Sequence, residues 1–178
     1  MIGALVVSTV LAACDPDPPT VTVRPLVFPV VGRVSYTDTF GAPRSGGRSH
    51  EGQDLMASKG QTIVAVADGT ITSVRYSPTG LSGNMITLTD ADGWRYYYIH
   101  INNDRPGTDD GANIYEQAFV DGVRAGQRVR AGEPIAYVGD SGNAETTAPH
   151  LHFEMHRPDG STVNAFASLQ AANKRART

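Results

Sequence analysis

The sequence predicts an all-β fold, a single domain whose largely antiparallel sheet forms a sandwich or a barrel-like core. Short runs rich in β-branched and aromatic residues recur along the chain, and turn signals containing glycine or aspartate separate them. Between two atypical ends lie about 140 residues, enough for one hydrophobic core and too few for two. We therefore expect one domain over residues 28–168.

The expected strands follow one another at short intervals. They cover residues 62–66, 70–74, 84–88, 95–99 and 134–138. Asp90-Ala91-Asp92-Gly93 has the composition of a calcium-binding loop, but it lacks the downstream glutamate that such a loop requires. It is interpreted as a hairpin turn between two strands.

Four of the five histidines fall in three short segments. His50 precedes Asp54 by four residues, His100 ends a tyrosine-rich run, and His150 and His152 form a pair. Catalytic zinc takes three protein ligands from such groups and leaves a fourth position open. His50, Asp54 and one histidine of the pair meet that requirement, and two histidines remain for proton transfer.

Alternation along extended strands places His50 on one face with Asp54, and His150 on one face with His152. Each pair also has an ordinary interpretation, as a surface turn or as alternating polar residues of a strand. Their coincidence with His100 on a third segment favours a metal site. His156 precedes a turn signal, so we interpret it as a solvated strand end outside the site.

Several motifs occur in an order that resembles the lysostaphin and LytM family of zinc metallopeptidases. The resemblance extends from about residue 28 to about residue 164 and rests on these segments: Phe40-Gly41-Ala42-Pro43-Arg44, His50-x-Gly52-x-Asp54, Val64-Ala65-Val66-Ala67-Asp68-Gly69, Tyr98-x-His100 and Pro149-His150-Leu151-His152-Phe153-Glu154. It implies a fold of the duplicated-hybrid-motif type with a metal groove across the sheet.

The resemblance also implies roles for single residues. His50, Asp54 and His152 match the family's ligands for one zinc ion per chain, and His100 and His150 match its catalytic histidines. Zinc lowers the pKa of a bound water toward ~7 and polarises a carbonyl. His150 is the expected proton carrier, and His100 is expected to orient the water or to donate to the oxyanion.

The implied activity is endopeptidase cleavage within the stem or bridge peptides of bacterial peptidoglycan, by a monomer. One alternative is a non-catalytic lipoprotein on the same fold that binds the cell wall or activates hydrolases. Another is a purely structural zinc, which would need a fourth protein ligand.

Two further features bear on the substrate groove. Alternation places Tyr96 and Tyr98 on the face of His100, so either could line the groove or pack in the core. The segment 102–123 is an insertion relative to shorter family members. Because it leaves directly from His100, we expect it to wall the groove, with surface decoration as the alternative.

The amino-terminal end predicts export. Residues 2–13 form an apolar run that fits the core of a signal peptide over 1–13, and Leu11-Ala12-Ala13-Cys14 resembles a lipobox. The sole cysteine, Cys14, is therefore the expected lipidation site, and residues 14–27 read as a proline-rich tether. This predicts a cell-membrane lipoprotein facing the cell wall or periplasm. No positive charge precedes the apolar run, and a cleaved signal with an incidental cysteine is the alternative.

Composition excludes nucleic acid as the expected partner. The net charge is -3, and basic residues cluster only in the expected tail, residues 169–178, which we interpret as solvated.

Overall fold

A computed structural model describes residues 21–175 of the chain, so the predicted signal peptide and Cys14 lie outside the described residues. The all-β prediction is confirmed, with antiparallel strand pairing throughout the described part. The strands are β1 (Gln53–Met56), β2 (Thr62–Val64), β3 (Gly69–Arg75), β4 (Asn84–Asp90), β5 (Arg95–Ile101), β6 (Arg128–Val129), β7 (Pro134–Tyr137), β8 (His150–His156) and β9 (Thr162–Val163). The helices are α1 (Tyr115–Ala118) and α2 (Phe166–Arg175), with 3-10 turns η1 (Ser45–Gly47) and η2 (Gly142–Ala144).

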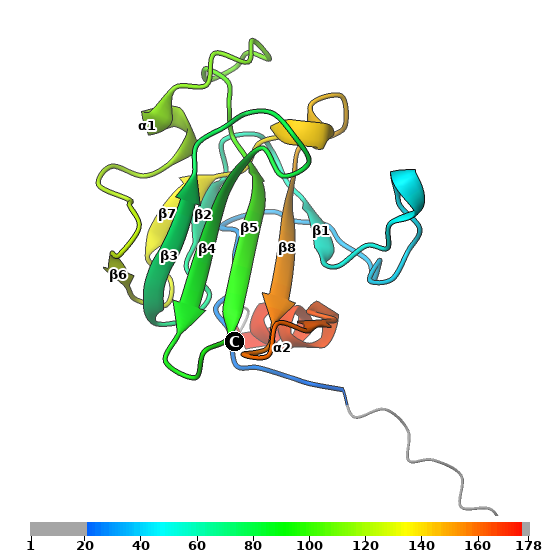
Figure 1. The fold of residues 1–178 in the computed structure, drawn as a ribbon. Coiled ribbons are helices and arrows are strands. Elements are labelled where there is room, and N and C mark those ends of the chain that lie inside the picture. Colours follow the sequence, from blue (N-terminus) through cyan, green and yellow to red (C-terminus); the bar gives the residue numbers. More distant parts are fainter. Residues whose placement is uncertain (1–20, 176–178) are drawn as a thin grey trace, which may run out of the picture.

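A large sheet carries the strand order β1-β8-β5-β4-β3-β6, with β9 added beside β8 (Figure 1). Strands β2 and β7 form a second, two-stranded sheet. The turn at Asp90 to Gly93 joins β4 to β5 as a hairpin, as predicted. In this order β8 lies between β1 and β5, so segments distant in sequence become neighbours.

The hydrophobic core lies between the two sheets. Alternate residues of β8 are buried, among them Leu151 and Phe153, while β7 contributes Ile135 and Ala136 from the other side. Burial of these apolar side chains is the main stabilising contribution, at about 25 cal/mol per Å² removed from water. The opposite face of β8 and β1 is left free to carry polar side chains.

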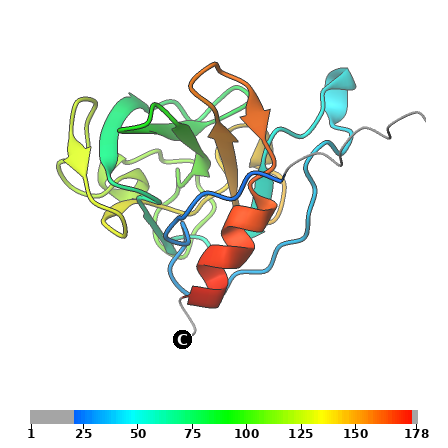
Figure 2. The same cartoon turned by 90° about the horizontal axis from the view of Figure 1, so that it is seen from below.

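Both ends of the described chain pack onto this core, which corrects the predicted boundaries. The expected basic tail is helical as far as Arg175, and Leu169 and Ala172 are buried. The last part of the expected tether is also packed: Leu26 belongs to the core, and the Arg24 backbone N–H donates to Ser168 Oγ. Figure 2 shows this amino-terminal segment running beside α2.

The insertion at 102–123 packs against the small sheet. Phe119 is fully buried and forms a β-bridge with Ala136, and the ring of Tyr115 lies 4.9 Å from that of Phe119. No helix among residues 21–175 is long and apolar enough to cross a membrane.

Candidate metal centre

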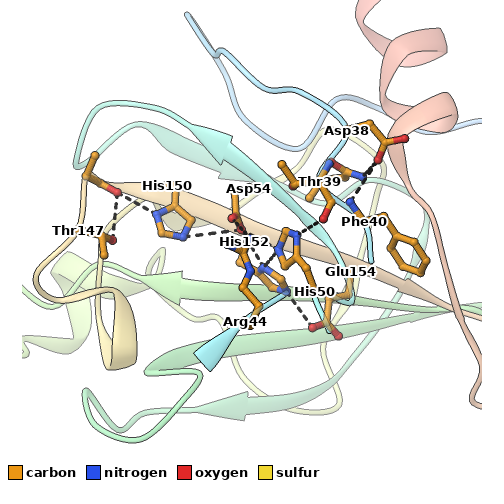
Figure 3. Close-up of polar contacts among 12 residues, drawn as sticks. Asp38, Thr39, Phe40, Arg44, His50, Asp54, Thr147, His150, His152 and Glu154 are labelled. Carbon is orange, nitrogen blue, oxygen red and sulfur yellow. Dashed lines mark hydrogen bonds and ion pairs between the residues drawn. The ribbon is translucent and has the colours of Figure 1, made fainter. Parts of the chain in front are cut away.

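The pairing of β1 with β8 builds a compact cluster from three of the predicted residues. Asp54 lies directly opposite His152 in the strand register. Asp54 Oδ1 is 2.9 Å from His152 Nδ1 and 3.0 Å from His50 Nε2, and the two histidine nitrogens are 2.9 Å apart. Residues about 100 positions apart in sequence thus present three ligand atoms to one point (Figure 3).

The outer nitrogen of each histidine is fixed by a separate acceptor. His50 Nδ1 is 2.9 Å from the carbonyl oxygen of Thr39, and His152 Nε2 is 2.8 Å from Glu154 Oε1. Donation of the ring proton to those acceptors leaves a lone pair on His50 Nε2 and on His152 Nδ1. Two imidazole nitrogens and one carboxylate oxygen, all acceptors, then face one another. This donor set fits a divalent metal of the zinc type.

The electrostatics of the cluster favour a bound positive charge. Burial alone would raise the pKa of Asp54, but hydrogen bonds with His152 and His50 hold it far below its usual range. Burial alone would lower the pKa of His152, yet hydrogen bonds with Asp54 and Glu154 raise it to about 8. The protein therefore keeps the carboxylate ionised and attracts a cation, whether a proton or a metal ion.

His100 and His150 lie beside this cluster, with rings 5.1 Å apart. His150 Nδ1 is 2.8 Å from the Ala148 carbonyl oxygen, and its Nε2 is 3.8 Å from Asp54 Oδ1. His100 Nδ1 is 2.8 Å from the carbonyl oxygen of Ser141. Each ring is therefore oriented through its Nδ1, and its Nε2 remains available to contact a bound molecule. Burial, followed by the charges of His150 and His152, lowers the pKa of His100 to about 4.

All five predicted residues line one cavity of about 560 Å³. Its other lining residues include Arg44, Arg48 and Glu51 on the side of η1, and Leu81, Ala144 and Ala148 on the side of η2. A cavity of this size admits a short stretch of peptide beside the cluster.

The sequence profile described as peptidase family M23 matches residues 48–165, which contain all five of these residues.

The chain belongs to peptidase family M23.

Two curated relatives illustrate the range of the M23 family. The chain is 34% identical over 142 residues to the murein hydrolase activator NlpD of Escherichia coli, which covers 80% of this chain and 30% of NlpD. It is 29% identical over 146 residues to an L-Ala--D-Glu endopeptidase of Bacillus subtilis, covering 78% of this chain and 40% of that protein. The chain thus spans well under half the length of these relatives.

Among solved structures, the catalytic domain of the antimicrobial peptidase lysostaphin from Staphylococcus simulans is similar to the M23 domain. The TM-score is 0.59 and the identity 26%, over 77% of this chain and 92% of that one. This supports the family and the fold.

The tyrosines of β5 are not part of the cavity in this M23 domain. Tyr96 and Tyr98 are fully buried in the core, and the Tyr98 hydroxyl accepts a hydrogen bond from the Val66 N–H. The expectation that they share a face with His100 is wrong, because alternation breaks at His100. Its φ is 63°, in the left-handed region, and the register with β4 shifts between Asn84 and Met85.

The insertion does not wall the cavity either, since no residue of 102–123 lines it. It lines a second cavity of about 450 Å³ together with Lys59 and Tyr137. One contact joins it to the η2 side of the first cavity: Asn103 Nδ2 donates to Glu145 Oε2, 2.9 Å away, and Glu145 directly follows η2. The insertion therefore contacts the η2 wall without lining the cavity.

Sequence reasoning missed three supporting residues of the M23 site. Glu154 orients His152 and is bonded in turn by His156, whose Nε2 is 2.7 Å from Glu154 Oε2. The alternation 152-154-156 on one strand could have revealed this chain of contacts. Thr39 and Arg44 carry no comparable signal, because their roles depend on how residues 39–49 fold back onto β1.

Proposed function

We propose that this chain is a zinc-dependent endopeptidase that hydrolyses amide bonds in the peptide part of bacterial peptidoglycan. The observation that carries the proposal is the completeness of the site. Three acceptor atoms converge within 3.0 Å, and two further histidines present a free nitrogen to the same cavity.

His50 Nε2, Asp54 Oδ1 and His152 Nδ1 are the proposed zinc ligands. Zinc bound there would supply Lewis acidity toward the scissile carbonyl and lower the pKa of water. Glu154 and the Thr39 carbonyl hold the two ligand rings in the required tautomer, a role that outer contacts commonly serve at zinc sites.

His150 and His100 are the proposed catalytic residues. His150 Nε2 would take a proton from water and return it to the departing amine, because its Nδ1 is already committed to the Ala148 carbonyl. His100, whose pKa is lowered to about 4, is neutral at pH 7. With Nδ1–H donated to Ser141, its Nε2 would accept a hydrogen bond and so orient the attacking water.

The substrate class is supported by the relatives. The similar Bacillus subtilis protein is named as an L-Ala--D-Glu endopeptidase, and the similar protein of Staphylococcus capitis as a glycyl-glycine endopeptidase.

We propose that the chain acts as a monomer and reaches peptidoglycan as an exported lipoprotein anchored at Cys14. Replacing Cys14 by Ser should then move the protein from the membrane fraction to the soluble one.

The second candidate is a non-catalytic activator of other hydrolases, favoured by the similarity to NlpD. A protein that acts only through binding has no need to keep a metal site. The complete ligand set and both further histidines therefore favour the enzyme.

The deciding experiment incubates the zinc-loaded protein with isolated peptidoglycan, with and without a chelator, and identifies released fragments by mass spectrometry. Chelator-sensitive release, absent from a His152→Ala control, is the expected result and would name the bond. Absence of release by protein with verified zinc would favour the activator.

A further inference from the structure

Residues 41–50 form a hairpin arm beside β1, with η1 at its tip (Figure 1). Pro43 and Ser49 form a β-bridge, and the Arg44 N–H donates to the Arg48 carbonyl at 2.9 Å. The two arginines are therefore opposite one another on the arm. Because the arm continues directly into His50, their position is fixed relative to the proposed zinc ligands.

Both arginines line the main cavity, and neither is fully engaged. Within residues 21–175, Arg48 forms no ion pair, and its guanidinium contacts only Ser45, at 3.2 and 3.4 Å. Arg44 uses Nη2 to bind Asp54 Oδ2, and its side chain is 36% exposed. The charge of Arg48 is therefore not offset by any carboxylate of the described residues, and Arg44 keeps the N–H groups that Asp54 does not use. An anion bound to both would offset the charge of Arg48.

The carboxylates that line the cavity do not form an ion pair with Arg48, so its guanidinium is open to a bound ligand. Asp54 is bound by Arg44 and the ligand histidines, and Glu154 is bound by His152 and His156. Glu51 is the remaining lining carboxylate, and it is exposed. The opposite side is uncharged and consists of Leu81, Ser82, Asn143, Ala144, Thr147 and Ala148. The cavity therefore has one side that carries two arginines and one side without charge, and both adjoin the histidine cluster.

We propose that Arg44 and Arg48 bind a carboxylate of the substrate close to the bond that is cut, so that the enzyme selects an acidic stem peptide over a neutral, glycine-rich bridge. This inference rests on the proposed function. The planar guanidinium matches a carboxylate through paired N–H donors. A glycine-rich peptide offers only neutral amides and gains nothing from the two charges.

The test compares a synthetic stem peptide carrying free carboxylates with the same peptide in which they are amidated, and with pentaglycine. Binding is measured by calorimetry on the chelator-treated full chain, where no peptide is consumed. Cleavage is measured on the zinc-loaded protein by chromatography. Amidation is expected to weaken binding about tenfold, as for a charge-assisted hydrogen-bonded pair.

Single substitutions test whether the preference for the acidic peptide over the amidated one depends on the hairpin arm. Arg48→Gln should remove most of the difference between the acidic and amidated peptides, and Arg48→Lys should restore part of it. Arg33→Gln removes an exposed arginine outside the cavity and should keep the full preference. Glu51→Gln changes the charge of the lining in the opposite sense and should not weaken binding of the acidic peptide.

Equal binding of the acidic and amidated peptides, or a preference that survives in Arg48→Gln, would overturn the inference. Cleavage of pentaglycine as efficient as that of the acidic peptide would also overturn it while leaving the endopeptidase standing. Selective binding of the acidic peptide without cleavage by zinc-loaded protein would have the converse meaning: the arm recognises carboxylates, but the chain is not the proposed enzyme.

Discussion

Two clusters of ligand-type side chains lie in this domain, and they differ in what neutralises them. His50, Asp54 and His152 form one, and Asp104, Asp109 and Glu145 form the other. In the second cluster, Lys59 Nζ lies 2.5 Å from Asp104 and 2.8 Å from Asp109, and it also reaches Asp140 at 2.9 Å. In the first cluster, two imidazole nitrogens and a carboxylate oxygen face one another, and Arg44 contacts the other oxygen of Asp54.

Carboxylates that lie close together are not sufficient for a metal site when a cation of the protein already neutralises them. Burial alone would lower the pKa of Lys59, but its hydrogen bonds to Asp104, Asp109 and Asp140 raise it instead. A resident ammonium group thus compensates the buried Asp104, and the cluster ties the insertion to the core. In the histidine cluster, Arg44 binds only Asp54 Oδ2, so Asp54 Oδ1, which faces His50 and His152, has no such ammonium group bonded to it and remains able to bind a metal ion.

The largest expected effect is the loss of metal from the histidine cluster. His152→Ala removes a proposed ligand, so both bound zinc and hydrolysis should disappear, because two remaining ligands hold zinc poorly. Lys59→Met is the matched change in the other cluster and should leave the zinc content unaltered. Elemental analysis of the two purified variants measures their zinc content. Loss of zinc from Lys59→Met would contradict the proposal that only the histidine cluster binds the metal.

Substitution of the proposed catalytic histidine should have a different effect from substitution of a proposed ligand. His150→Ala is expected to keep zinc while kcat falls by about 10²–10⁴, the usual contribution of a positioned acid–base group. Metal content and the rate of peptide cleavage are measured on the same sample. A metal-free His150→Ala protein would contradict the proposed division between ligands and proton carrier.

A substitution in the second cluster, which contains Asp104, Asp109 and Glu145, should change the free energy of unfolding. Lys59→Met leaves the fully buried Asp104 without its cation and is expected to cost about 3 kcal/mol of unfolding free energy. Urea denaturation measures the change. Adding Asp104→Asn and Asp140→Asn to Lys59→Met should recover part of the loss, because the uncompensated charges are then removed. Absence of any loss would mean that Lys59 is dispensable to the cluster.

The smallest effect tests the placement of the β5 tyrosines. Tyr98→Phe leaves the Val66 N–H without its acceptor, for an expected cost of about 1–3 kcal/mol. Zinc content and cleavage rate per folded molecule should be unchanged. Tyr97→Phe, a partly buried control on the same strand, should shift stability by less than about 0.5 kcal/mol. An altered cleavage rate in Tyr98→Phe would restore the groove interpretation.

Sequence patterns located most of the strands because alternation and turn chemistry are local properties. They also singled out His50, Asp54 and one histidine of the pair at 150 and 152, and the family resemblance selected His152. The structure brings His50, Asp54 and His152 together. The order of the strands across the sheet could not be predicted from these local patterns, because the position of β8 between β1 and β5 depends on packing between distant segments.

The errors have particular physical causes. His100 was placed on the wrong face relative to the tyrosines because alternation assumes an unbroken strand, and its left-handed backbone breaks it. Helix α2 is not predicted because few of its residues are buried, among them Leu169 and Ala172, and so its apolar pattern is weak. One signal is present in the sequence: Asn164, whose side chain accepts a hydrogen bond from the N–H of Phe166, the first residue of the helix.

The proposed ligand residues of the histidine cluster are separated by up to 102 positions along the chain. A zinc ion held there would bridge two distant segments, as a covalent cross-link would, and the bridge exists only in the folded chain. Thermodynamic linkage then makes free zinc a stabiliser, adding about 2.7 kcal/mol when its concentration is a hundredfold above Kd. The supply of zinc would therefore set the resistance of the domain to unfolding and proteolysis as well as its activity.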